Sequence, residues 1–322
     1  MAVLTPITIE EARLLVTEYG LGELGELTGI PAGSVNSNFR LDLAGRRVFL
    51  RIYEEQDAAG AAGEAAMLEH LAAAGVPTPA PLPRRDGGLI STVRAKPAAL
   101  FPWRDGGICC QLGVTEPIAQ RLGRALAQVH LAGAGLVCHP GRFGFESLCD
   151  RLDRIAASGD VTFAPLEPAL RAMLSRTHHA RDPHLPSGLI HSDLFRDNVL
   201  WDSAGDVAAL LDFESACAGT YAYDLMVCVL SWCFGSDFQP ELARAMCKGY
   251  AGVRPLRDSE REALLVEGSF AALRFTITRI TDYAMRAATS EPRVVKDWRR
   301  FQARYDKLQA LGSDGLRRLL GL

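Results

Sequence analysis

His191-Ser-Asp-Leu-Phe-Arg-Asp-Asn198 and, further along the chain, Leu211-Asp-Phe-Glu214 are the two segments that decide the fold. Short apolar runs flank both, so we expect a strand to end just before the first segment and the chain to loop before it re-enters a strand. That loop can present Asp193 and Asn198 together. The following strand ends at Leu211, so Asp212 should emerge beside them at the same end of a small sheet. Two carboxylates and one amide oxygen are therefore predicted at one place.

These oxygen-bearing side chains suit phosphoryl transfer. The transfer passes through a loose transition state, which requires in-line positioning of a hydroxyl and neutralisation of phosphate charge, usually by magnesium held on oxygen ligands. Asn198 and Asp212 suit the metal, and Asp193 suits the acceptor hydroxyl as an orienting group and proton acceptor. The spacing, His-x-Asp with Asn five residues on and a later Asp-Phe, matches the protein-kinase template, which we apply here.

A plainer interpretation of the same residues stays open. Asp193 and Asp197 are also ordinary turn formers, and Asn198 and Asp212 could merely cap strand ends. Three acceptors spaced around two strand signals favour the functional interpretation. His191 is expected to be a hydrogen-bonded scaffold for the loop rather than a base.

The composition, with 48% hydrophobic residues in a chain of 322, is that of an ordinary soluble globular protein. The 35 basic residues against 38 acidic ones include no basic run, so nucleic-acid binding is not expected. The apolar run near residues 225–234 is far short of the roughly 20 residues that cross a bilayer, so no membrane span is expected. The N-terminal sequence turns acidic without an apolar stretch, which predicts a cytoplasmic protein. The eight cysteines and seven histidines show no spacing suited to zinc.

The first hundred residues combine strand and helix signals. Thr8 begins a capping box before an amphipathic helix that should run to about Gly20. Alternating apolar residues predict a hairpin over residues 38–53, and alanine-rich sequence predicts a helix over 58–74. A last short strand is expected over 89–93.

Beyond about residue 104 the periodicity is mainly helical, with amphipathic stretches at 260–286 and 296–320. The exceptions are the strands expected around the opening segment, at 188–190, 199–201 and 207–211. An α+β fold follows, with a small antiparallel-sheet lobe before a larger, mainly helical lobe.

Three further segments carry a family resemblance. They are Gly33-Ser-Val-Asn-Ser-Asn-Phe39, Glu64-Ala-Ala-Met-Leu-Glu-His-Leu-Ala-Ala-Ala-Gly-Val-Pro77 and Ala222-Tyr-Asp-Leu225. Together with the opening segment they resemble the aminoglycoside phosphotransferase and choline kinase superfamily. The resemblance implies ATP and Mg²⁺ as cofactors and a bilobal protein-kinase-like fold. Its parts would be a nucleotide-binding lobe at 1–97, a hinge at 98–104 and a catalytic and acceptor-binding lobe at 105–322.

Within that superfamily the chain is most similar to the bacterial homoserine kinases of this fold. The likeness runs through Asn36-Ser-Asn-Phe39, Phe49-Leu-Arg-Ile-Tyr-Glu54, Lys96-Pro-Ala-Ala99 and Ser231-Trp-Cys-Phe234. It implies a small-molecule acceptor, L-homoserine, which ATP would convert to O-phospho-L-homoserine.

The superfamily pattern also implies nucleotide contacts. Arg51 falls where a lysine usually holds the nucleotide phosphates, and Glu64 falls where a helix glutamate partners that lysine. Arginine keeps the positive charge but differs in geometry, and the alternative is an exposed strand charge beside Glu54. The resemblance also implies that backbone N–H groups of a turn can face phosphate oxygens, and the residues of that turn are Gly33, Ser34, Asn36, Ser37 and Asn38. Two residues of the hinge, Leu100 and Phe101, are also expected to contact the nucleotide. Taken alone, that turn equally fits an ordinary connection.

The acceptor pocket is the least determined part. Homoserine carries a carboxylate, which suits an arginine fork, and Arg274 and Arg279 lie in a late helix that covers the acceptor site in the resembled families. An equally good interpretation is a solvated helix face that pairs with Asp282. Glu214 could face the acceptor amine, although the homoserine kinases often have an aromatic residue there.

Two polar residues are given structural roles. Asp224 opens an apolar helix, for which an N-cap is a sufficient explanation. His130 ends an amphipathic helix and is expected to be a hydrogen-bonded structural histidine.

Three functions remain in competition. A homoserine kinase uses Asp193 as base, with Asn198 and Asp212 on magnesium. A related kinase for an aminoglycoside, choline, ethanolamine or a modified sugar would share all three residues. A nucleotide-binding pseudokinase is motivated by Arg51 in place of lysine, but it has no chemical need for all three.

Overall fold

The structure is a computed structural model and describes residues 3–31, 35–285 and 296–322. The chain forms two compact units. The first comprises Met1–Gly107 and Ala208–Glu214, and the second comprises Ile108–Val207 and Ser215–Leu322. A short segment from the second half of the chain thus belongs to the first unit.

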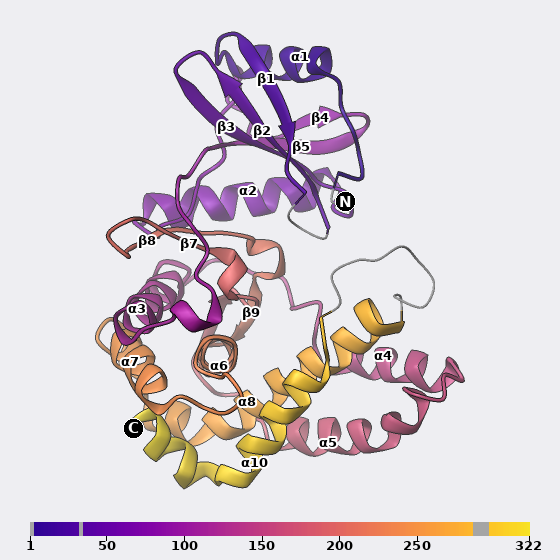
Figure 1. Cartoon of the computed structure of the whole chain (residues 1–322), viewed down its shortest axis with the longest axis vertical. Coiled ribbons are helices and arrows are strands. Elements are labelled where there is room, and N and C mark those ends of the chain that lie inside the picture. The colour runs from indigo at the N-terminus through magenta and orange to yellow at the C-terminus, as the bar shows by residue number, and fades with distance from the viewer. Residues whose placement is uncertain (1–2, 32–34, 286–295) are drawn as a thin grey trace. The chain divides into compact units, whose positions relative to one another are not determined.

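The first unit is built on a five-stranded antiparallel sheet of order β1-β2-β3-β5-β4. Its strands are β1 (Leu24–Gly29), β2 (Ser37–Leu43), β3 (Arg46–Ile52), β4 (Ser91–Val93) and β5 (Lys96–Pro102) (Figure 1). The predicted hairpin is confirmed as β2 and β3, whose register pairs Asn38 with Arg51.

Two strands of this sheet were not predicted. β1 contains glycine and glutamate and has only weak alternation, so its strand conformation comes from pairing with β2 rather than from propensity. β5 covers most of the segment expected to be a hinge, and its backbone pairs with β3 and β4.

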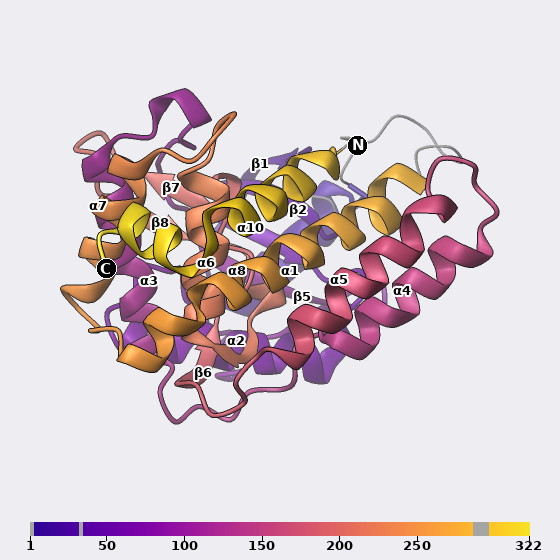
Figure 2. The same cartoon turned by 90° about the horizontal axis from the view of Figure 1, so that it is seen from below.

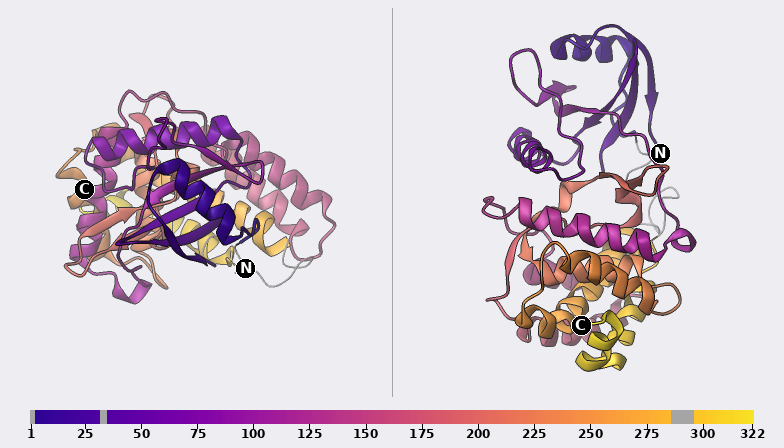
Figure 3. Two further views of the ribbon diagram at one scale, coloured as in Figure 1. Left: turned by 90° about the horizontal axis from the view of Figure 1, so that it is seen from above. Right: turned by 90° about the vertical axis from the view of Figure 1, so that its left-hand side faces the viewer.

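One face of the sheet is covered by α1 (Ile9–Tyr19). The predicted capping box is present, because Glu11 N donates to Thr8 Oγ1 at 3.2 Å and Thr8 N donates to Glu11 Oε2 at 2.7 Å. The buried residues of α1 form one hydrophobic core with inward-facing side chains such as Leu41 and Leu50. Figure 3 (left) shows α1 lying across the strands.

The second helix, α2 (Ala58–Ala73), lies against the other face. Its first turn is capped by Asp57, and the chain turns away at Gly75 with φ of +85°. Successive side chains of a strand point to opposite faces. Arg51 therefore points away from the core that contains Leu50, and it contacts Glu64 on α2.

The second unit is mainly helical (Figure 2). Its α-helices are α3 (Glu116–Ala132), α4 (Phe145–Ala157), α5 (Glu167–His179), α6 (Tyr221–Trp232), α7 (Pro240–Ala251), α8 (Asp258–Arg279) and α10 (Arg299–Leu320). Every residue of α6 is buried, which agrees with its apolar sequence. The two late helices were predicted, and α8 and α10 lie side by side in Figures 1 and 2.

Glycines allow α3 and α7 to approach closely. A Cβ atom added at Gly123 of α3 would lie 2.1 Å from the carbonyl oxygen of Met246, and one added at Gly249 of α7 would lie 1.9 Å from that of Gln120. Any larger residue at either position would force the backbones apart. The C-terminal end of α10 also contacts α7, where Arg244 donates to the Arg318 carbonyl (Figure 3, right).

The short strands around the opening segment correct one prediction. β6 (Ser187–Ile190) pairs with β9 (Cys217–Thr220), not with the strands that follow the opening segment, β7 (Val199–Trp201) and β8 (Val207–Leu210). The sequence of β9, Cys-Ala-Gly-Thr, carries no strand signal. Its residues are small because the Ile190 side chain packs against this strand. A Cβ atom added at Gly219 would lie only 2.3 Å from Ile190 Cδ1.

The remaining elements are short helices: η1 (Gln111–Gly113), η2 (Ala164–Leu166), η3 (Arg196–Asn198), η4 (Phe213–Ser215) and a π-helical segment, η5 (Ile280–Ala284), that continues α8. Within the described ranges, none of the helices combines the length and the apolar character needed to span a membrane.

Candidate active site

Arg51 of β3 is held by Glu64 of α2 in the first unit. The two side chains are 13% and 5% exposed, and Arg51 Nη1 donates to Glu64 Oε1 at 3.2 Å. Glu64 also accepts hydrogen bonds from the Tyr53 hydroxyl at 3.4 Å and from Gln56 Nε2 at 3.0 Å. The alternative of an exposed strand charge is wrong, because the guanidinium group is buried.

Asp212 lies beyond the other end of the same guanidinium group. Its Oδ1 is 4.0 Å from Arg51 Nη2, and its side chain is 42% exposed. Burial acts to lower the pKa of Arg51, but the carboxylates of Glu64 and Asp212, with a smaller contribution from Glu214, outweigh it and raise that pKa. Arg51 is therefore a permanent cation. Glu214, predicted beside an acceptor amine, acts electrostatically on Arg51.

Asp212 also has an unusual backbone conformation. Its φ is +62°, in the left-handed region, which costs a non-glycine residue about 1–3 kcal/mol and in which strained residues of active sites recur. The carboxylate is only loosely paired with Arg51 at 4.0 Å, so it keeps the capacity to take another cation.

The turn predicted to face phosphate is described only in part. Gly33 and Ser34 lie outside the described residues. The Asn36 side chain accepts from Glu54 N at 3.2 Å, and Ser37 Oγ accepts from Thr5 N at 2.9 Å. Both side chains thus tie the described part of the turn to the rest of the unit. Asn38 is buried in β2, opposite Arg51.

Leu100 and Phe101 are strand residues. They pair with Leu50 and Phe49 across β5 and β3, and both are buried. The Leu100 carbonyl accepts from Leu82 N at 2.7 Å. Because that hydrogen bond already uses the carbonyl, a ligand that donates to the Leu100 carbonyl would have to share it.

The opening segment forms a tightly held loop in the second unit. His191 and Ser192 directly follow β6, and their backbone N–H groups each donate to Asp224 of α6, at 2.7 Å to Oδ2 and Oδ1 respectively. Ser192 has φ of +67°, so this strained residue is held by a buried carboxylate. The His191 ring accepts from Asp193 N at 3.3 Å, as a scaffold residue would.

The N-cap role predicted for Asp224 is wrong. α6 begins at Tyr221, so Asp224 lies inside the helix and is fully buried. Burial raises the pKa of its carboxyl group, but hydrogen bonds from His130 and from the loop outweigh that effect and lower the pKa. The charge is stabilised by directed donors rather than by water.

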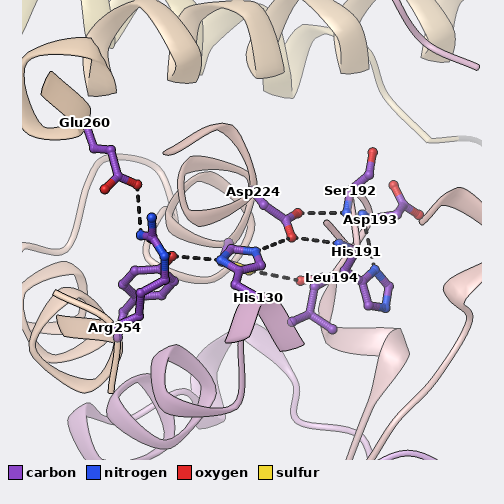
Figure 4. Close-up of polar contacts among 10 residues, drawn as sticks. His130, His191, Ser192, Asp193, Leu194, Asp224, Arg254 and Glu260 are labelled. Atoms are coloured by element: carbon purple, nitrogen blue, oxygen red, sulfur yellow. Dashed lines mark hydrogen bonds and ion pairs between the residues drawn. The ribbon is translucent and has the colours of Figure 1, made fainter. Parts of the chain in front are cut away.

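His130 links this loop to Arg254 and Glu260 through a chain of polar contacts (Figure 4). Its Nε2 is 3.0 Å from Asp224 Oδ2 and its Nδ1 is 2.7 Å from the Tyr250 hydroxyl, to which Arg254 Nη1 donates at 3.0 Å. Arg254 also donates to the buried Glu260. Burial lowers the pKa of His130, so the neutral ring, with its proton on Nε2, fits both partners. His130 is the structural histidine that the sequence predicts.

Asp193 and Asn198 are brought together by the loop. Asn198 Nδ2 donates to the Asp193 carbonyl at 2.8 Å, which leaves the amide oxygen without a protein partner among the described residues. The Asp193 side chain is 29% exposed. Asp193 and Asn198 belong to the second unit and Asp212 to the first, so their meeting at one site stays a prediction.

Arg274 and Arg279 do not form the solvated helix face that the alternative interpretation described. Arg274 is buried, and its Nη1 donates to Asp193 Oδ1 at 3.1 Å. Asp282 instead pairs with Arg151. Arg279 lies 4.4 Å from the centre of the Phe301 ring, and burial and the nearby Arg300 lower its pKa to about 10.

Each of the two predicted metal ligands, one in each unit, offers an oxygen of the kind that magnesium takes. Asn198 offers an amide oxygen and Asp212 a loosely paired carboxylate, and Mg²⁺ in kinases is held by one or two such groups together with substrate phosphates. In the described part of the chain, no three His, Cys, Asp or Glu side chains cluster closely enough to hold a metal ion by themselves. A fully protein-built metal centre is therefore not found in these ranges.

The chain matches the model of the phosphotransferase enzyme family over residues 26–263. It therefore belongs to this family, and the predicted class of enzyme, a phosphotransferase with a hydroxyl acceptor, is confirmed. The chain is 35% identical over 292 residues to the homoserine kinase of Rhizobium etli, covering 88% of this chain and 89% of the relative. It is 36% identical over 298 residues to the homoserine kinase of Caulobacter vibrioides, covering 89% and 92%.

Among solved structures, the fold resembles spectinomycin phosphotransferase in complex with ADP and spectinomycin. The TM-score is 0.69 at 14% identity, and the match covers 97% of this chain and 100% of that one. At this identity the likeness concerns the fold, and it confirms the predicted α+β kinase-like class.

Proposed function

We propose that this chain transfers the γ-phosphoryl group of ATP to the hydroxyl group of L-homoserine. The single observation that carries the reaction type is the held loop: Asp193 stands partly exposed on a backbone fixed by the buried Asp224. A carboxylate fixed in this way can orient a hydroxyl for in-line attack. The acceptor is supported by the homoserine kinases that match the chain over nearly its whole length.

In this proposal the first unit binds the nucleotide. Arg51 is a permanent cation whose position is fixed by Glu64, and its fork can bind phosphate oxygens. Asn198 and Asp212 would hold Mg²⁺, which when bound neutralises phosphate charge. Tyr53 and Gln56 keep Glu64 in place, so the arginine meets the nucleotide without reorganisation.

Asp193 acts on the acceptor. It accepts a hydrogen bond from the acceptor hydroxyl and takes up its proton as the new oxygen–phosphorus bond forms. We assign Arg279 to binding the carboxylate group of the acceptor. In the described part of the chain it has no carboxylate partner, whereas Arg274 is committed to Asp193. Glu214 as a ligand of the acceptor amine stays a prediction.

A coupled ADP-release assay with homoserine, choline, ethanolamine, methylthioribose and kanamycin tests the function. We expect the highest kcat/KM with L-homoserine, and a product heavier by one phosphoryl group in mass spectrometry. A higher kcat/KM with another acceptor would contradict homoserine as the acceptor, but it would still support the assignment as a small-molecule kinase. ATP-dependent thermal stabilisation without turnover of any acceptor would indicate a pseudokinase.

The acceptor assignment has its own test. Arg279→Met should raise the KM for homoserine and leave the KM for ATP unchanged, because it removes the charge proposed to bind the acceptor carboxylate, together with a hydrogen bond to the Asp297 carbonyl. An unchanged KM for homoserine would remove Arg279 from the acceptor site.

A further inference from the structure

Arg274 is an immobilised cation on α8. Its guanidinium carbon lies 4.1 Å from the centre of the Phe143 ring and 3.8 Å from that of Phe275. The side chain is 3% exposed, and its Nε atom has no hydrogen-bond partner among the described residues. A guanidinium group enclosed by two aromatic rings has little freedom to change its position.

The ion pair divides the two oxygens of Asp193 between two tasks. Oδ1 accepts from Arg274 Nη1 at 3.1 Å, while Oδ2 has no hydrogen bond within the described ranges and the side chain stays 29% exposed. One oxygen is therefore anchored to the interior, and the other is open to a ligand. Rotation of the carboxylate would break the anchored contact.

The loop backbone fixes Asp193 from a second direction. His191 and Ser192 are held by Asp224, and Asn198 holds the Asp193 carbonyl. These contacts determine where the Cα atom lies, but they leave the side-chain torsions free. The hydrogen bond from Arg274 Nη1 to Asp193 Oδ1 is what determines the orientation of the carboxylate itself.

We propose that Arg274 is a positioning residue that aims Asp193 at the acceptor hydroxyl. In a loose phosphoryl-transfer transition state the nucleophile contributes little bond formation, so the orientation of the acceptor hydroxyl matters most. A carboxylate with one oxygen fixed by Arg274 and the other open suits that requirement.

The inference rests on the proposed role of Asp193, and it differs from the earlier assignment of Arg274 to the acceptor carboxylate. A carboxylate ligand should act on the KM for homoserine. A positioning residue should act on kcat, because the acceptor still binds but its hydroxyl is aimed poorly. The split between the two kinetic constants therefore separates the two roles.

Steady-state kinetics of Arg274→Met and Arg274→Lys test the proposal. We expect kcat to fall by about a hundredfold in the methionine variant, with the KM for the acceptor changed by less than about threefold. The lysine variant should recover part of kcat, because it restores the charge without the planar fork. A rise in the acceptor KM with unchanged kcat, or no change in either constant, would overturn the proposal.

Arg151→Met is the matched control. Arg151 also lies near the Phe143 ring, at 5.5 Å, and pairs with a carboxylate, Asp282, but it does not contact Asp193. It should keep kcat near the wild-type value. A loss equal to that of Arg274→Met would mean that any broken ion pair here damages the unit, and would count against the proposal.

Phe143→Leu provides a second variant if Arg274→Met does not fold. It removes one of the two rings and keeps the charge, so a smaller loss in kcat is expected, and an unchanged kcat would contradict the enclosure argument. All variants are compared with the wild type on the acceptor that the wild type uses best. Failure with homoserine alone would therefore contradict the proposed acceptor and not the role of Arg274.

Discussion

Each unit of this protein contains a buried arginine paired with a carboxylate, and we propose opposite roles for the two pairs. In the first unit Glu64 is 5% exposed and Arg51 is the group that we expect to meet the ligand. In the second unit Arg274 is 3% exposed and Asp193, at 29%, is the group that we expect to meet the ligand. In each pair, we expect the more buried partner to hold the other side chain in place and the more exposed partner to contact the ligand. In the proposed function, the same pair of residue types would serve a cationic phosphate contact in one unit and an anionic hydroxyl contact in the other.

Asp193→Asn should give the largest effect. The amide can still accept a hydrogen bond but cannot take the proton and no longer attracts Arg274, so kcat should fall by about a thousandfold or more while ATP binding persists. Single-turnover kinetics and ATP titration measure the two properties. Asp197→Asn, an exposed neighbour in the same loop, is the control. Near-wild-type turnover of Asp193→Asn would remove Asp193 from the chemistry.

Asp212→Ala should raise the Mg²⁺ concentration for half-maximal activity by about tenfold or more, because one of two proposed protein ligands is lost. A magnesium titration of initial rates checks this. Asp206→Ala, which removes a carboxylate paired with Arg121, should leave the titration unchanged. The same titration curve for wild type and Asp212→Ala would exclude Asp212 as a ligand.

Arg51→Met should raise the KM for ATP by about tenfold through loss of a charged hydrogen-bond donor, whereas Arg51→Lys should stay within a few fold of the wild type. Initial rates at varied ATP concentrations give these constants. Arg47→Met on the same strand, whose partner is the exposed Asp105, is the control. If Arg51→Met changes kcat and leaves the KM for ATP alone, the two arginines do not divide their roles as described.

The smallest effect concerns pH and stability. Burial lowers the pKa of His130 below its usual 6.5. Between the two values the unfolded chain binds a proton that the folded chain does not, so this group makes the free energy of unfolding fall as the pH falls through about 6.5.

His130→Gln should lower stability by about 1–3 kcal/mol at neutral pH and should remove part of that pH dependence. Denaturant unfolding at several pH values measures both. Tyr250→Phe keeps the imidazole and should keep the pH dependence. An identical pH dependence in His130→Gln and wild type would contradict a neutral, buried His130.

Local signals explain what the sequence could predict. The capping box at Thr8, the β2–β3 hairpin and the loop that joins Asp193 to Asn198 all depend on residues close in the chain. β1 and β9 lack such signals, because partner strands and close packing determine their conformation.

The residues that fix the loop and the Asp193 side chain could not be predicted from the sequence. Asp224 is 33 residues from His191, and Arg274 is 81 residues from Asp193. No spacing rule links positions so far apart, and each lies on a helix whose sequence suggests a simpler role. The motif thus predicts which groups act, and that assignment stays a prediction, while the contacts that hold those groups could be read only from the folded chain.

A double-mutant cycle on Asp193 and Arg274 tests most directly the claim that the arginine acts through the carboxylate. kcat is measured for the wild type, Asp193→Asn, Arg274→Met and the double variant. If Arg274 serves only to aim Asp193, the double variant should have the kcat of Asp193→Asn within about threefold. Multiplication of the two separate losses would show that Arg274 acts independently of Asp193 and would contradict the account.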